Sequence, residues 1–190
     1  MRRVLVTMAA MLLPSLPASA QERGDVGLAT GYPGAIGVVW HASERLAIRP
    51  DFTFSRTTSE NESGPTAGLE TTGWSLGVGV SALFYTGGVG SLRTYVSPRV
   101  AYARLSTTSE ASASTSPSES TTNTWQFAGT FGAQYAIGER FSVFGEAGLA
   151  YSHGTSTFRV GGLPAGVEPG ETTNQTFGTR TAVGVVLYFK

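Results

Sequence analysis

Apolar and polar residues alternate along most of the chain with a period of two. From residue 74 to residue 84 every even-numbered residue is apolar, and from 73 to 81 every odd-numbered residue is glycine or serine. Similar alternation runs through residues 125–135 and 177–189. This spacing is typical of β-strands with one apolar and one polar face, because successive side chains of a strand point to opposite sides.

Short turns and long polar stretches alternate between these predicted strands. Short turns are expected at 42–45, 87–90 and 137–140, and long polar loops at 58–71, 107–124 and 156–176. A turn at 32–34 gives the first, short loop at the same end as the long ones. The segments between them predict eight strands, at 24–31, 35–41, 46–56, 72–86, 92–106, 123–136, 141–155 and 176–189. Most reach the ~9–11 residues that a tilted strand needs to cross a bilayer. The first two are shorter, so the count of eight depends on the hairpin at 25–41.

Short turns at one end and long loops at the other are typical of outer-membrane barrels. The sequence therefore predicts an all-β fold, an eight-stranded antiparallel transmembrane β-barrel with up-and-down meander topology. Its apolar face must contact lipid, because the other face is too polar and too small to do so. A soluble lipocalin-like barrel or sandwich, with the apolar face inside, is the alternative fold.

Aromatic residues of the apolar parity fall into two bands, as in the interfacial girdles of a membrane barrel. A soluble sandwich has no reason to place aromatics at both ends of the same face. The band near the short turns contains Trp40, Phe84, Tyr135, Phe141 and Phe189, and the band near the long loops contains Phe54, Trp74, Tyr102, Trp125, Tyr151 and Phe177.

The N-terminus predicts export. Arg2 and Arg3 precede the largely apolar residues 4–13, and Ala18-Ser19-Ala20 forms a small-x-small cleavage site. This is the pattern of a secretory signal peptide, and its apolar part is too short to span a bilayer as a helix. We expect residues 1–20 to be cleaved and residues 21–190 to form the barrel domain.

Composition excludes some classes of partner and cofactor. The leader carries two of the 13 basic residues and none of the 13 acidic ones, so the mature chain has a net charge near −2, which argues against nucleic-acid binding. There is no cysteine and only two histidines, so no metal site or other cofactor is expected. Charged residues make up 14% of the chain, where about 25% is usual for soluble domains.

Five charged residues have the inward parity and lie at similar depth. They could form a structural ion-pair network that fills a narrow lumen, because an eight-stranded barrel is just wide enough for side chains to fill. They could also line a gated pore. These residues are Arg49, Asp51, Arg99, Glu146 and Arg180. Pro50 and Pro98 stand next to them and are expected to mark β-bulges, because proline cannot donate to a strand ladder.

Three basic residues, Arg56, Arg104 and His153, each lie two positions beyond an aromatic of the outer band. We expect them at the outer headgroup level, either in contact with lipopolysaccharide phosphates or as ordinary solvated residues. His153 and Thr155 also have the spacing of the His and Ser of lipid A deacylases. Thr155 replaces the serine, however, and no acid is evidently placed to orient the imidazole, so no catalytic residue is assigned.

The leader, the eight segments, the short inner turns and the closing Gly-Val-Val-Leu-Tyr-Phe of residues 184–189 together resemble the small OmpA/OmpX-like outer-membrane β-barrel proteins. The resemblance covers essentially all of residues 21–190. It implies a monomer in the outer membrane, in contact with lipid and lipopolysaccharide. It also implies insertion by the outer-membrane assembly machinery, which recognises a terminal aromatic. Here Lys190 follows Phe189.

Three functions stay open, because this pattern is specific for fold and not for activity. The expected one is a structural or surface-interaction barrel without catalysis, whose Ser/Thr-rich loops face outward. A narrow porin-like channel is the first alternative, and a lipid A-modifying enzyme is the second.

Overall fold

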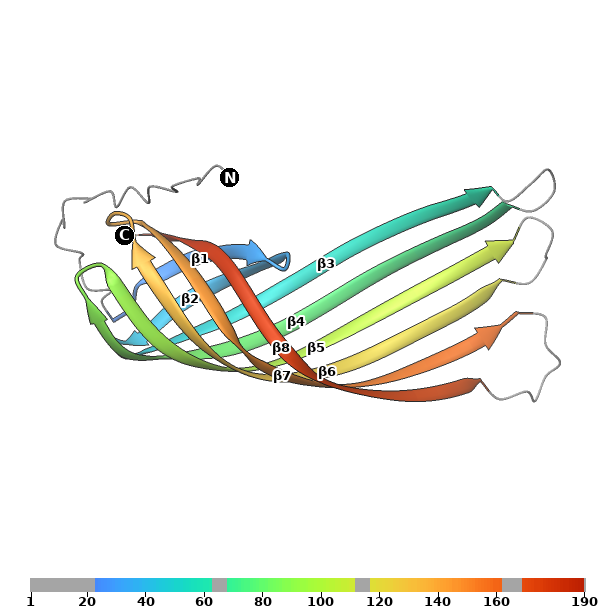
Figure 1. Cartoon of the computed structure of the whole chain (residues 1–190). Coiled ribbons are helices and arrows are strands. Elements are labelled where there is room, and N and C mark those ends of the chain that lie inside the picture. Colours follow the sequence, from blue (N-terminus) through green and yellow to red (C-terminus); the bar gives the residue numbers. More distant parts are fainter. Residues whose placement is uncertain (1–22, 63–67, 112–116, 162–168, 190) are drawn as a thin grey trace, which may run out of the picture.

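The structure is a computed structural model that describes residues 23–62, 68–111, 117–161 and 169–189. Eight antiparallel strands follow one another around a closed barrel, in which β8 pairs with β1 (Figure 1). The predicted eight-stranded meander is therefore confirmed, including its short first hairpin. The strands are β1 Val26–Tyr32, β2 Ala35–Ser43, β3 Leu46–Glu62, β4 Gly68–Val89, β5 Leu92–Ala111, β6 Ser118–Ala136, β7 Phe141–Val160 and β8 Gly170–Phe189.

The predicted leader, residues 1–20, lies outside the described residues. No helix among the described residues is long and apolar enough to cross a membrane.

The apolar face of the barrel points outward. Phe131 on β6 is 58% exposed and Val80 on β4 is 47% exposed, whereas Tyr95 and Leu83, of the opposite parity, are 0% and 2% exposed. A soluble barrel with its apolar face inside is contradicted by these exposures. In β4, β6 and β7 the two aromatic bands enclose residues 74–84, 125–135 and 141–151, close to the about 9–11 residues that a tilted strand needs to cross a bilayer.

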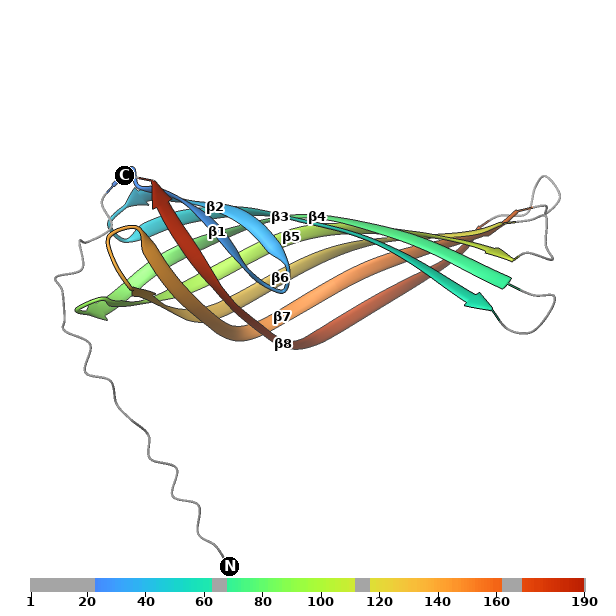
Figure 2. The ribbon, with the colours of Figure 1, turned by 90° about the horizontal axis from the view of Figure 1, so that it is seen from above.

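The prediction of three long polar loops is wrong for most of their residues. The polar stretches lengthen β3 to β8 well beyond the outer aromatic band, and the six strands continue together as a long sheet (Figure 2). Threonine and serine suit strands, and cross-strand hydroxyl pairs join them here. Thr71 Oγ1 lies 3.1 Å from Ser109 Oγ, and Thr122 Oγ1 lies 2.8 Å from Ser156 Oγ. A strand outside the bilayer needs no apolar face. The polar extensions of β3 to β8 therefore have the composition of loops, which is why the sequence predicted loops there.

The expected bulges at Pro50 and Pro98 are also wrong. Pro50 pairs with Val80, and Pro98 pairs with Gly129, without a change of register. On the other edge of each proline the ladder is interrupted while the register stays the same, as a missing N–H requires. The register shifts lie instead between residues 41 and 43 and between residues 85 and 87, close to the short turns.

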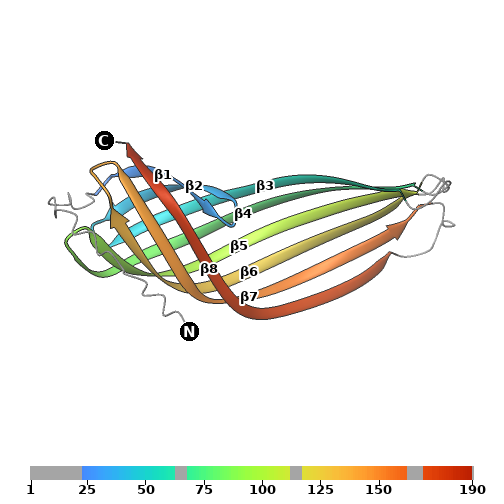
Figure 3. The same cartoon turned by 45° about the horizontal axis from the view of Figure 1, so that its top comes forward.

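The β1–β2 hairpin is much shorter than the other strands (Figures 1 and 3). It turns at Pro33 and Gly34, where Gly34 has a positive φ of 53° that glycine adopts without strain. The pairing of β1 with β8 ends at Tyr32 and Val183, and that of β2 with β3 ends at Ile36 and Phe52. Beyond these pairs β3 and β8 are not hydrogen-bonded to each other, and they continue as the two margins of the open six-stranded sheet (Figures 1 and 2). We call the opening between β3 and β8, where the first hairpin ends, the seam.

Candidate functional site: a filled lumen below an open cavity

The inner end of the lumen is filled by hydrogen-bonded aromatic and polar side chains. Tyr85 Oη donates to Gln134 Oε1 at 2.9 Å, and Gln134 Nε2 donates to Tyr188 Oη at 2.9 Å. Tyr188 Oη lies 3.2 Å from Nε2 of His41, whose ring stacks on Tyr85 with centroids 5.6 Å apart. All four side chains are buried. The Arg93 guanidinium lies 4.0 Å from the centroid of the Tyr85 ring.

Tyr95 joins this aromatic layer to the charged layer above it. Its hydroxyl donates to Glu146 Oε1 at 2.8 Å, and its ring packs edge-on against Tyr85. Glu146 is paired across the lumen with Arg49, whose Nη2 lies 2.7 Å from Oε1. Their side chains are 2% and 8% exposed, so each compensates a charge that would be costly to bury alone. The Arg49 guanidinium also lies 5.0 Å from the centroid of the Phe144 ring.

The other inward charges form the next layer. Both terminal nitrogens of Arg99 donate to the Asp51 carboxylate, one of them at 2.7 Å. Arg180 donates to Gln126 Oε1 at 3.4 Å and forms no ion pair with any described residue. Of the five residues predicted to line the lumen, the structure thus places four in two ion pairs and leaves Arg180 with an amide partner. We call the first two layers the plug: the aromatic layer of His41, Tyr85, Gln134 and Tyr188, and the Tyr95, Arg49 and Glu146 side chains above it.

Inward glycines make room for these large side chains. A Cβ at Gly132 would lie 2.4 Å from the Tyr95 ring, and one at Gly79 would lie 2.3 Å from Nη2 of Arg99. Real Cβ atoms do not approach so closely, so the Tyr95 ring and the Arg99 guanidinium can hold these positions only while the facing residues are glycine.

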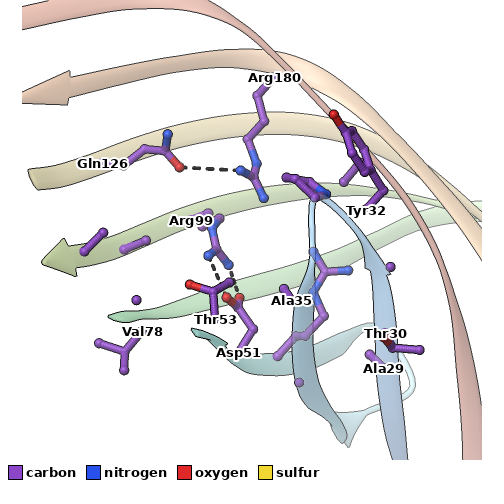
Figure 4. A pocket seen from close by; sticks show the side chains of 18 of the residues that line it. Ala29, Thr30, Tyr32, Ala35, Asp51, Thr53, Val78, Arg99, Gln126 and Arg180 are labelled. Carbon is purple, nitrogen blue, oxygen red and sulfur yellow. Dashed lines mark hydrogen bonds and ion pairs between the residues drawn. The ribbon is translucent and has the colours of Figure 1, made fainter. Parts of the chain in front are cut away.

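A cavity of about 300 Å³ lies on the outer side of the plug. Arg49, Asp51, Arg99 and Arg180 line it together with small residues of β1, β2, β5 and β8. Figure 4 shows Arg99 and Arg180 pointing into it, with the Tyr32 end of the first hairpin forming one wall.

The predicted girdle aromatics lie on the outer surface. Tyr102 is half-buried against Trp125, with ring centroids 5.1 Å apart, and the other ten are exposed. Phe54 and Phe177, which border the seam, are the most exposed at 63% and 71%. The exposed aromatics are Trp40, Phe84, Tyr135, Phe141, Phe189, Phe54, Trp74, Trp125, Tyr151 and Phe177.

The three outward basic residues do not meet at one point. Arg56 is exposed and pairs in register with Trp74, and the exposed Arg104 lies 5.9 Å from the centroid of the same ring. His153 is half-buried on β7, opposite Trp125 on β6 and Gln175 on β8. Within the described part of the chain, no carboxylate pairs with His153.

The tyrosines and the glutamine of the plug were not among the predicted site residues. Tyr85, Tyr95 and Tyr188 each follow or precede an outward apolar residue, so strict parity places them inside. Assigning every aromatic residue of the strands to a face by its parity would therefore have placed these three tyrosines in the lumen. No group of three or more His, Cys, Asp or Glu side chains that could hold a metal ion occurs among the described residues.

The closed meander, the outward apolar face and the filled lumen define a small eight-stranded barrel of the outer-membrane type. No family model matches the chain, and no curated protein matches it. Its fold is similar to that of a major outer membrane protein from Thermus thermophilus, with a TM-score of 0.54 and 12% identity over 87% of this chain and 97% of that one. At this identity the likeness shows the fold alone.

Two Acinetobacter baumannii proteins also align along most of the chain. CarO has a TM-score of 0.40 at 13% identity, over 88% of this chain and 98% of its own. CarO2 has a TM-score of 0.43 at 10% identity, over 87% and 97%.

Proposed function

We propose that this protein is an exported outer-membrane barrel that does not conduct and has a structural or surface-interaction role. Its six long strands would carry a Ser/Thr-rich sheet beyond the membrane, where it could contact surface partners. The observation that carries this proposal is the plug. Tyr95 and His41 are both 0% exposed, and the Arg49–Glu146 ion pair crosses the lumen above them, with the Arg99–Asp51 pair beside it.

A narrow channel is the second candidate, because three arginines line the open outer cavity. Conduction would require the rings of Tyr85, Tyr95 and Tyr188 to leave a buried, hydrogen-bonded layer. Leaving one buried polar partner unsatisfied costs about 1–3 kcal/mol, which disfavours a conducting state at rest. The position of His153, with no paired carboxylate among the described residues, supports a role without catalysis.

Planar-bilayer recording tests the proposal. We expect the wild-type protein to give no steady conductance, whereas Tyr95→Ala combined with Glu146→Ala should give small open-channel currents because it removes the bridge between the two layers. A heat-modifiability gel must first show that both proteins are folded barrels. Steady wild-type conductance that changes in Arg180→Ala would contradict the proposal and support the channel.

A further inference from the structure

The charges that line the lumen do not cancel. Arg49 pairs with Glu146 and Arg99 pairs with Asp51, so Arg180 remains as one surplus positive charge. Its only described hydrogen bond is a long one to the neutral Gln126, and its buried Nε has no partner in the described structure. A guanidinium in this position has unused donors that suit a carboxylate or phosphate.

Small apolar residues form much of the wall of the cavity, beside the two ion pairs to which Arg49, Asp51 and Arg99 belong. Its walls include Ala29, Ala35, Ala101 and Ala182, and Phe144 lies at its inner end against the plug. Its volume of about 300 Å³ is at the lower end of the roughly 300–1,000 Å³ that is typical of small-ligand pockets. A single short acyl chain matches this space, whereas a two-chain lipid does not.

The seam opens beside this cavity. Arg180 lies three residues from Val183, where the pairing of β8 with β1 ends, and Thr53 lies next to Phe52, the last residue of β3 to pair with β2. Both Thr53 and Arg180 line the cavity. Phe54 and Phe177 follow on the same two edges and belong to the outer aromatic band. The seam therefore begins on the bilayer side of this band, at the level of the outer leaflet, and continues past it.

Unpaired strand edges at membrane depth are unfavourable unless they line a water-filled or ligand-filled space. The two strands of the first hairpin are nonetheless the shortest of the eight, and the hairpin ends beside the cavity that Arg180 lines. An amphiphile in the outer leaflet would meet this opening with its chain in the apolar layer and its charged head near Arg180.

We propose that the outer cavity is a binding site for a single-chain anionic amphiphile, which enters through the seam and places its carboxylate on Arg180. The acyl chain packs against the alanines and Phe144, and Gln126 adds a neutral hydrogen bond to the head group. This inference goes beyond the proposed function and does not depend on it, because the cavity lies on the outer side of the plug whether or not the barrel conducts.

The test uses decanoate labelled with ¹³C at its carboxyl group and the full barrel in phospholipid nanodiscs. We expect saturable binding to one site per barrel after subtraction of partitioning into empty nanodiscs. Arg180→Gln should weaken binding about tenfold or more, because a charge-assisted hydrogen bond is lost. The matched control, Arg140→Gln in an exposed inner turn, should bind like the wild type.

A second comparison needs only the wild-type protein and therefore does not depend on the folding of a variant. Decanol has the same chain without the charge and should bind at least about tenfold more weakly than decanoate. Equal binding of decanol and decanoate, unchanged decanoate affinity in folded Arg180→Gln, or no saturable binding at all would each overturn the proposal.

Discussion

At the scale of single residues, the packing of the lumen depends on glycines as much as on the large side chains that face them. Tyr95 is fully buried because Gly132 on the neighbouring strand leaves its ring space. Gly129, three residues away, has no atom within 4 Å of the position of a Cβ and lies on the outward face. The two glycines of β6 therefore offer the same substitution in opposite environments.

We predict that Gly132→Ala destabilises the folded barrel by about 1–3 kcal/mol, because overpacking forces the Tyr95 ring away from Glu146. Gly129→Ala should leave the free energy of unfolding unchanged within about 0.5 kcal/mol, since its methyl group points to lipid. Denaturant unfolding of both variants in the same micelles measures the difference. Equal stability of the two variants would show that the lumen is loosely packed at Tyr95.

At the scale of strands, alternation alone predicts a large part of the structure. Parity places Arg49, Asp51, Arg99, Glu146 and Arg180 inside before any coordinates are known. It does not predict which of them meet, because partners such as Arg49 on β3 and Glu146 on β7 face each other across the lumen. That pairing depends on how far the strands are staggered around the barrel, which no local pattern encodes.

The strand extensions were missed for a related reason. Outside the membrane both faces of a strand contact water, so alternation disappears and Ser/Thr-rich segments look like loops. Hydroxyl pairs such as Thr122 with Ser156 hold these segments in register. Aromatic content alone does not separate the tyrosines of the plug from the two outer girdles, because only the parity of each residue distinguishes the inward from the outward side chains.

The outer face at the base of the extensions carries a prediction about lipid. Arg56 on β3 and Arg104 on β5 flank Trp74 on β4, so two cations lie beside one interfacial ring. We propose that they contact lipopolysaccharide phosphates.

Replacing both arginines by serine should weaken lipopolysaccharide binding about fivefold, as expected for two exposed charge contacts. Titration of the folded protein measures this effect, with Arg140→Ser at the inner end as control. Unchanged affinity would show that the two side chains are merely solvated.

At the scale of the whole molecule, the two ends of the barrel differ in structure. The inner end is closed by short turns and the plug, whereas the outer end continues as a six-stranded sheet that the first hairpin does not reach (Figures 1 and 2). Six strands of 17 to 22 residues are about twice as long as a tilted strand needs to cross a bilayer.

We propose that the chain spans the outer membrane with its long sheet at the cell surface and its short turns inside. The native chain has no cysteine, so single cysteines report cleanly. In intact Gram-negative cells, a membrane-impermeant maleimide should label Glu171→Cys, on the exposed outer part of β8, and should label Glu139→Cys, in an exposed inner turn, only after the outer membrane is permeabilised. Labelling of Glu139→Cys in intact cells, or protection of Glu171→Cys, would contradict this orientation of the barrel in the membrane.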